Sequence, residues 1–357
     1  MIFDTTLSSA LVEFYTTEKA TSVVNFGDGM GDYVKDFKKN NITSDGYDFN
    51  PNTTQFDKPY DWVMSLDIGE HLPCEFEDIF INNLHNNNNH GIVLSWAIKT
   101  QEGVGHLNEQ NNDYIKSKIC KLGYINDIDN ENKLRDSSSL PRFKKTIMVF
   151  RKFKNTFPSI NFDLNNVFLH GWFQENNILT FDFIINNYSI KNMCELGSWF
   201  GLSSKYFCSE LNGKLYCIDL WYNNYIINKE ENKFIDDQYC NDDKLLLKDR
   251  NLYSTFLNNL YEFKNTVVPI RTNTISGIEL LYNQQIPIDL FYIDANHTYD
   301  SVKQEILIIK EKYPCALIFG DDYSFPGVKQ AVNELAIKFN DIELVINYPC
   351  WFYKPRT

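Results

Sequence analysis

The chain has 357 residues, of which 43% are hydrophobic and 15% aromatic, so it is long and apolar enough for two folded domains rather than a disordered protein. Its formal net charge of −13 argues against a broad basic face for a polyanion, which disfavours nucleic acid as a partner. No run of 18 apolar residues and no basic-then-apolar leader is visible, so we expect a cytoplasmic protein with no membrane partner.

The first half of the chain alternates strand-like and helix-like segments. Strands are expected at residues 22–26, 44–48, 61–66, 91–96 and 145–150, and helices at residues 31–40, 73–83 and 113–122. Such alternation builds an α/β sheet with helices on both faces. Basic residues and Pro158 follow the last strand, which predicts a boundary that divides the chain into domains 1–153 and 160–357.

The second half repeats this plan. Strands are expected at residues 192–196, 214–218, 289–294, 316–319, 342–346 and 350–353, and helices at residues 202–211, 301–311 and 327–339. The polar and charged stretch 222–249 is interpreted as an insertion or lid. The sequence therefore predicts two α/β domains of similar design.

A glycine-rich loop follows the first strand of each half, and an acid ends the second strand. The candidate cofactor-binding residues are Gly27, Asp28, Gly29, Gly31 and Asp48 in the first half, and Glu195, Gly197, Ser198, Gly201 and Asp219 in the second. A glycine turn lets a ligand approach the backbone, and an acid at the next strand end can hold two ribose hydroxyls. The alternative is that each loop is only a tight turn between strand and helix.

Neither loop has the G-x-G-x-x-G spacing of a dinucleotide-binding fold, which disfavours an NAD-dependent dehydrogenase. Both loops, with the acid-x-glycine start at Glu195 and the closing strands 147–150 and 351–353, resemble class I methyltransferases that use S-adenosylmethionine. The resemblance implies an α/β fold of two tandem Rossmann-like domains, each a mostly parallel sheet with an antiparallel closing strand. It also implies S-adenosylmethionine as the cofactor.

Three carboxylates and a histidine stand at the ends of two neighbouring strands in the second half. Asp294 ends one strand, Asp321 and Asp322 end the next, and His297 follows Asp294 by three residues. Because the carboxyl ends of neighbouring parallel strands meet at one crevice, these acids should converge and repel one another unless a cation lies among them. Oxygen ligands favour Mg²⁺, with Mn²⁺ or Ca²⁺ as relatives. The alternative is a solvated turn at the two adjacent acids and a capping or packing role for His297.

The motifs Asp-x-x-His at residues 294–297 and Gly-Asp-Asp-Tyr at residues 320–323 resemble metal-dependent sugar O-methyltransferases of the macrocin type, over residues 192–354. The resemblance implies Mg²⁺ (or Mn²⁺) bound by Asp294, Asp321 and Asp322, with two vicinal sugar hydroxyls on the metal. His297 is then the base that deprotonates one hydroxyl before it attacks the methyl group. Asp294 and His297 are thus the catalytic candidates of this half.

Residues 23–151 resemble an uncharacterised methyltransferase-like family found in animals, which implies the fold but no substrate. His71 is the catalytic candidate and His106 an alternative base. The competing interpretation is that His71 caps or packs beneath the next helix. Asn25 stands where the first motif usually has an acid, which weakens cofactor anchoring. Because no acid triad is visible here, we expect this half to be metal-independent.

The first functional hypothesis is a bifunctional S-adenosylmethionine-dependent O-methyltransferase that acts on a sugar, a nucleotide-sugar or a glycan. The alternatives are one active domain beside a degenerate scaffold domain, and a small-molecule or nucleic-acid methyltransferase. Self-association into a homo-oligomer stays open. The abundance of asparagine, isoleucine and lysine resembles proteins of AT-rich genomes such as those of giant DNA viruses, in which case the cytoplasm is the host's.

Overall fold

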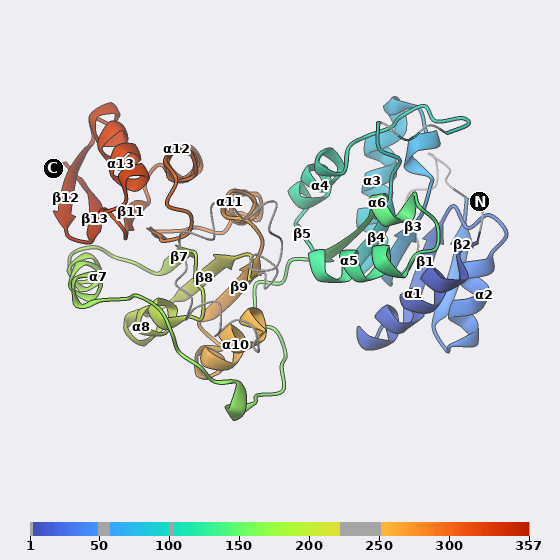
Figure 1. The fold of residues 1–357 in the computed structure, drawn as a ribbon, viewed down its shortest axis with the longest axis horizontal. Helices are drawn as coiled ribbons and strands as arrows, with labels where there is room; N and C mark the ends of the chain where they lie inside the picture. Colours follow the sequence, from blue (N-terminus) through green and yellow to red (C-terminus); the bar gives the residue numbers. More distant parts are fainter. Residues whose placement is uncertain (1–2, 49–57, 100, 102, 222–250, 357) are drawn as a thin grey trace. The chain divides into compact units, whose positions relative to one another are not determined.

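The computed structural model describes residues 3–48, 58–99, 101, 103–221 and 251–356 (Figure 1). The chain divides into two compact units, Met1–Phe153 and Lys154–Thr357, each built on its own β-sheet. The stretch 222–249, expected as an insertion or lid, lies outside the described residues.

The first unit is a six-stranded sheet flanked by helices. Its strands are β1 (Ser22–Phe26), β2 (Thr43–Tyr47), β3 (Tyr60–Ser65), β4 (Asn88–Ser95), β5 (Tyr124–Asn126) and β6 (Ile147–Lys152). Its helices are α1 (Thr5–Thr17), α2 (Asp32–Lys39), α3 (Glu77–Asn86), α4 (Asn112–Lys121), α5 (Ile128–Ser137) and α6 (Phe143–Thr146). The strand order is β2-β1-β3-β4-β6-β5; the first four strands run parallel, and β6 is antiparallel to β4 and β5.

Successive residues of the central strands pack on opposite faces of this sheet. Val23 lies in a buried cluster with Phe37 of α2, whereas Val24 lies in a second cluster with Phe80 of α3. Because both faces are covered by helices, strands such as β1 and β3 must be apolar on both sides. This is why apolar residues stand at successive positions in both strands, as at Val23–Val24 in β1 and Trp62–Met64 in β3.

The second unit is a seven-stranded sheet with the order β12-β13-β11-β10-β7-β8-β9. Its strands are β7 (Asn192–Leu196), β8 (Lys214–Asp219), β9 (Val267–Arg271), β10 (Leu290–Ile293), β11 (Leu317–Gly320), β12 (Ile342–Asn347) and β13 (Cys350–Pro355). Its helices are α7 (Glu175–Asn187), α8 (Leu202–Glu210), α10 (Leu252–Asn259), α11 (Thr274–Asn283), α12 (Tyr299–Lys312) and α13 (Pro326–Lys338). Strand β13 is antiparallel to both β11 and β12, and the remaining pairs are parallel.

The fold class expected from the sequence is confirmed, because each unit is a mixed α/β structure with a mostly parallel sheet and antiparallel strands at one side. The strand expected from residue 145 begins instead at Ile147. Residues Phe143–Thr146 form the helical turn α6, in which the Thr146 hydroxyl donates to the Arg142 carbonyl at 2.9 Å. Strands β5 and β9 were not among the expected strands. Pro269 lies at the centre of β9, which is the sheet's edge strand, where a residue without an N–H is tolerated.

Several helices also fall where none was expected, namely α1, α5, α7, α10 and α11. Four of them begin at an aspartate or asparagine whose side chain accepts a hydrogen bond from the first turn: Asp4, Asp127, Asn251 and Asn273. Aspartate and asparagine are preferred N-cap residues, so the starts of these helices could have been predicted from the sequence although their apolar periodicity is weak.

Strand register brings the predicted acids of the second unit to one edge. Leu196 on β7 pairs with both Ile218 on β8 and Ile293 on β10, and Ile293 pairs with Gly320 on β11. The residues that follow these pairs therefore leave the sheet side by side. This edge also contains the point between β7 and β10 where the strand order reverses, which is where open α/β sheets bind ligands.

Candidate functional site

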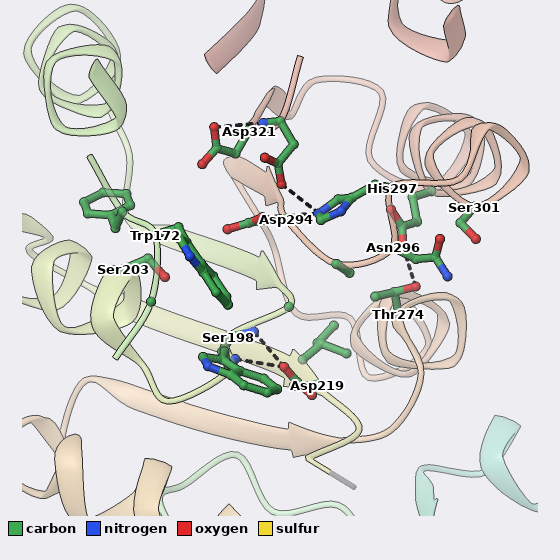
Figure 2. Close-up of a pocket in the computed structure, with 18 of the residues that line it drawn as sticks. Trp172, Ser198, Ser203, Asp219, Thr274, Asp294, Asn296, His297, Ser301 and Asp321 are labelled. Carbon is green, nitrogen blue, oxygen red and sulfur yellow. Dashed lines mark hydrogen bonds and ion pairs between the residues drawn. The ribbon is translucent and has the colours of Figure 1, made fainter. Parts of the chain in front are cut away.

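A cavity of about 1020 Å³ opens at this edge of the second unit. Figure 2 shows Ser198 and Asp219 on one side of it, and Asp294, His297 and Asp321 on another. The glycine loop after β7, the loops after β10 and β11, and the starts of α11 and α12 all contribute to its wall.

Asp219 ties the glycine loop to the end of β8. One carboxylate oxygen of Asp219 accepts hydrogen bonds from the backbone N–H groups of Ser198 and Trp199, each at 2.9 Å, and the other accepts from Trp221 N–H at 2.8 Å. Gly197 has a φ of +87°, and a Cβ there would lie 2.1 Å from the Asp294 carbonyl oxygen. Only glycine allows the loop to pass so close to the end of β10.

Glu195 stabilises the same loop from inside the unit. Its side chain is fully buried and accepts hydrogen bonds from the hydroxyls of Ser198, Ser203 and Ser204. Burial raises the pKa of Glu195, and these hydroxyl donors act in the opposite direction. Glu195 is therefore placed to hold the loop, with Ser198 between it and the cavity. Gly201, with a φ of +85°, caps the following helix α8.

Asp294, His297 and Asp322 meet at the ends of β10 and β11. One ligand atom from each lies within 4.8 Å of the others. His297 Nε2 is 2.7 Å from an Asp322 carboxylate oxygen and 3.9 Å from an Asp294 oxygen. Burial, and then the like charges of Asp321 and Asp322, raise the pKa of Asp294 to about 8. Burial lowers the pKa of His297, but its two carboxylate partners outweigh burial and raise it to about 10.

Asp321 lies beside this cluster and points differently from Asp322. One of its oxygens accepts a hydrogen bond from Asn177 Nδ2 at 2.6 Å, and the other accepts from the Asp322 backbone N–H at 2.8 Å. The Tyr292 hydroxyl lies 3.2 Å from Asp294 and 3.5 Å from Asp321, so it links the two carboxylates. The structure thus brings two of the three predicted acids, Asp294 and Asp322, together with His297. The third acid, Asp321, is linked to Asp294 through the Tyr292 hydroxyl.

Two functional candidates of this edge were missed from the sequence. Asn177 lies on α7 and is fully buried, and nothing in its local sequence indicates that it contacts Asp321. Glu305 lines the cavity from α12 and is 1% exposed; one oxygen accepts from the Thr274 hydroxyl at 2.6 Å, and Oε2 has no hydrogen-bond partner. Burial raises the pKa of Glu305 to about 7. Glu305 could have been found from the sequence, because this acid occupies a position on the apolar face of a predicted helix.

The glycine loop of the first unit uses a different internal bond. Asn25 Nδ2 donates to the Asp28 carboxylate at 2.9 Å, and the Asp28 side chain lies over Gly46, where a Cβ would be 2.1 Å from it. Burial raises the pKa of Asp28. Gly27, Gly29 and Gly31 all have positive φ, and Gly31 caps α2, as Gly201 caps α8. Asp48 follows β2 and is exposed.

The two candidate bases of the first unit lie next to each other. The rings of His71 and His106 are 5.0 Å apart in an edge-to-face arrangement, and Glu70 lies beside them. His71 Nδ1 is 3.0 Å from the Gly105 carbonyl oxygen, and His106 Nδ1 is 2.8 Å from a Glu109 oxygen. Glu70 is buried, and burial raises its pKa to about 7.

Among the described residues of both units, no helix is long and apolar enough to cross a membrane.

Residues 194–323 match a protein-family model described as a methyltransferase domain. The second unit therefore contains a methyltransferase domain, and the enzyme class predicted from the sequence is confirmed. No curated protein matches the chain.

Solved structures similar to the chain include three methyltransferases. Phosphoethanolamine N-methyltransferase 1 of Haemonchus contortus is 11% identical with a TM-score of 0.34, covering 95% of this chain and 84% of its own. A TDP-rhamnose 3′-O-methyltransferase of calicheamicin biosynthesis is 13% identical with a TM-score of 0.34, covering 51% and 81%. Magnesium protoporphyrin IX methyltransferase of Synechocystis PCC 6803 is 15% identical with a TM-score of 0.29, covering 41% and 81%.

Proposed function

We propose that the second unit transfers a methyl group from S-adenosylmethionine to a hydroxyl group of a sugar, a nucleotide-sugar or a glycan. The observation that carries this proposal is one cavity bordered by the glycine loop with Asp219 and by the Asp294, His297 and Asp322 cluster. Ligand pockets usually measure roughly 300–1,000 Å³. A cavity of about 1020 Å³ therefore has room for a cofactor and an acceptor together.

The cofactor side of the cavity is fixed before any ligand arrives. Asp219 accepts three backbone N–H groups, which holds its carboxylate at the cavity wall. The Asp219 carboxylate also lines the cavity, where a ribose hydroxyl can donate a further hydrogen bond to it. Trp199 lines the same wall and offers an aromatic face to the adenine ring. Gly197 and Ser198 then pass along the ribose and amino-acid part of the cofactor.

The residues at the other side fit a divalent cation. Asp294 and Asp322 bring carboxylate oxygens within 4.8 Å of a nitrogen of His297, and a dication would relieve the repulsion between the two acids. Asp321, linked through Tyr292, is the third oxygen donor at this edge. Carboxylate oxygens suit Mg²⁺ and Mn²⁺. Either ion, when bound, would lower the pKa of a coordinated sugar hydroxyl.

His297 is placed to receive the proton of that hydroxyl once a cation held by Asp294 and Asp322 offsets the carboxylate charges that raise the pKa of His297 to about 10. Its ring lies at the cavity wall and contacts the Phe325 ring, with 4.6 Å between ring centres, which restricts its orientation. Proton transfer from the sugar hydroxyl to His297 Nε2 leaves an oxygen nucleophile. As the new C–O bond forms, the methyl–sulfur bond breaks and the sulfonium becomes a neutral thioether.

The first unit is proposed as a second S-adenosylmethionine-binding domain, which would make the chain bifunctional. The support is its equivalent loop, in which Gly27 and Gly31 keep the same positive φ as Gly197 and Gly201. Calorimetry of the full chain with S-adenosylmethionine counts the sites directly. Two sites support a bifunctional chain, and one site supports an active second unit beside a scaffold domain.

Methyl transfer tests the proposed chemistry. We would incubate the full chain with methyl-labelled S-adenosylmethionine and a panel of nucleotide-sugars, with Mg²⁺, with Mn²⁺ or with EDTA. Each acceptor with vicinal hydroxyls is paired with a deoxysugar that lacks one of them. Asp294→Asn should abolish metal-dependent transfer, whereas the control Asp341→Asn, at an exposed acid paired with Lys310, should not change it. Equal transfer by wild type and Asp294→Asn would refute the metal-assisted sugar mechanism.

A further inference from the structure

We infer that Glu70, His71 and His106 form a binding site for a divalent transition-metal ion in the first unit. One ligand atom from each of the three side chains lies within 4.8 Å of the others. This inference is independent of the function proposed for the second unit, and it runs against the expectation that the first half works without a metal.

The first argument is the buried carboxylate. Glu70 is 1% exposed, and its Oε2 has no hydrogen-bond partner. An unpaired carboxylate oxygen inside a protein costs free energy unless a donor or a cation satisfies it. The nitrogen atoms of two imidazoles stand close to this carboxylate, and His71 is exposed to solvent. The arrangement leaves a path by which an ion can enter.

The second argument is the orientation of the two imidazoles. His71 Nδ1 donates to the Gly105 carbonyl oxygen, and His106 Nδ1 faces the Glu109 carboxylate. Metal-binding histidines usually donate their second ring N–H to a carbonyl or a carboxylate in this way, which fixes the tautomer and leaves Nε2 as the ligand. Both histidines therefore already have the outer partners that a metal site requires.

The third argument is the place of the cluster in the fold. Glu70 and His71 follow β3, and His106 follows β4. In the second unit, Asp294 and His297 follow β10, and Asp322 follows β11. Strand β3 pairs with β1 and β4 as β10 pairs with β7 and β11, so both clusters occupy the same topological position.

The ligand types in this cluster indicate which metal ion it would bind. Two imidazoles and one carboxylate are ligands for Zn²⁺, Fe²⁺, Mn²⁺ or Co²⁺ rather than for Mg²⁺, which prefers oxygen. Ligand atoms around a four-coordinate Zn²⁺ lie roughly 3.4 Å apart. Zn²⁺ binding therefore requires the three ligand atoms to move closer together, and His71 is the exposed member of the cluster. Three protein ligands leave a fourth position open, as in metal sites that act on a bound molecule.

Metal binding can be measured without any activity. The full chain, carrying Asp294→Asn and Asp322→Asn to disable the second unit's cluster, is stripped with EDTA and dialysed against micromolar Zn²⁺. We expect one Zn²⁺ per chain by elemental analysis, and a d–d absorption band when Co²⁺ replaces Zn²⁺. His71→Ala should lose this Zn²⁺ or bind it at least tenfold more weakly, and His90→Gln, elsewhere in the unit, should bind as the parent does.

Further variants separate the loss of a metal ligand from the loss of the fold. His71 is exposed, so His71→Ala should keep the fold even where a buried substitution fails. Glu70→Gln preserves the shape of the buried side chain and removes its charge, and it should weaken Zn²⁺ binding as His106→Ala does. Unchanged Zn²⁺ stoichiometry and affinity in folded His71→Ala and Glu70→Gln would overturn the inference. Absence of bound Zn²⁺ and Co²⁺ in the parent would overturn it as well.

Discussion

Replacing Glu305 with glutamine tests whether the carboxylate buried beside the cavity destabilises the second unit when it ionises. Burial raises the pKa of Glu305 from 4.5 to about 7, although the charge of His297 acts against this. Between these two pH values the folded chain binds a proton that the unfolded chain has released. The contribution of Glu305 to stability therefore falls as pH rises through this window and changes no further above about pH 7.

The magnitude follows from the size of the pKa shift. At 1.36 kcal/mol per pKa unit, the ionised Glu305 costs about 3 kcal/mol above pH 7. Glutamine resembles the protonated acid and can still accept from the Thr274 hydroxyl, so Glu305→Gln should match wild type near pH 4.5 and exceed it above pH 7. For a unit of this size, about 2–4 °C per kcal/mol gives roughly 6–12 °C in Tm.

Scanning calorimetry in EDTA, at pH 5 and at pH 8, measures this difference for the transition of the second unit. Glu343→Gln, at an exposed acid on β12, is the matched control and should change Tm equally at both pH values. If the Tm of Glu305→Gln exceeds that of wild type by no more at pH 8 than at pH 5, ionised Glu305 does not destabilise the second unit. A variant less stable than wild type at pH 8 would mean that the charged carboxylate has a stabilising partner.

Three further changes probe the loop and the cation site. Asp219→Asn should weaken S-adenosylmethionine binding by about 10–100-fold in calorimetry, because a charged acceptor is lost; unchanged affinity would remove Asp219 from the cofactor site. Gly197→Ala adds a Cβ 2.1 Å from a backbone oxygen and should lower Tm far more than Gly29→Ala, where nothing lies within 4 Å. Asp322→Asn weakens the ion pair with His297 and should abolish Mg²⁺-dependent transfer while cofactor affinity persists; loss of both would indicate a general structural defect.

The position of the site could be predicted from the sequence because parallel strands end at a common edge. Asp219 and Asp294 each follow a short apolar strand, and strand register alone brings them to one crevice. No side-chain detail was needed for that step. The same reasoning placed His297 at the start of the next helix, near both acids.

The orientation of the adjacent acids could not be predicted in this way. Asp322 has a φ of +58°, which turns its carboxylate to His297, while Asp321 is held by Asn177 from a helix 144 residues earlier in the chain. A sequence motif places both acids at the strand end, but a distant helix decides which one faces the histidine. The Glu70, His71 and His106 cluster could not be predicted for a similar reason. Glu70 and His106 are far apart in the sequence, and only the fold brings them close together.

The comparison of the two glycine loops changes how Asn25 is interpreted. From the sequence, Asn25 indicates a lost anchoring acid, because its counterpart is Glu195. In the structure, Glu195 is buried and accepts from the hydroxyl of Ser198, three residues later. Asn25 makes the same connection with donor and acceptor exchanged, because its amide donates to Asp28, three residues later.

Asn25 therefore preserves the internal bond of the loop rather than removing a cofactor contact. What differs is the location of the negative charge, which is buried at Glu195 in the second unit but lies within the loop at Asp28 in the first. A charge in the loop favours the ammonium group of a bound amino acid and opposes its carboxylate. If the first unit binds S-adenosylmethionine, Asp28 and not Asn25 is the residue that should set its affinity.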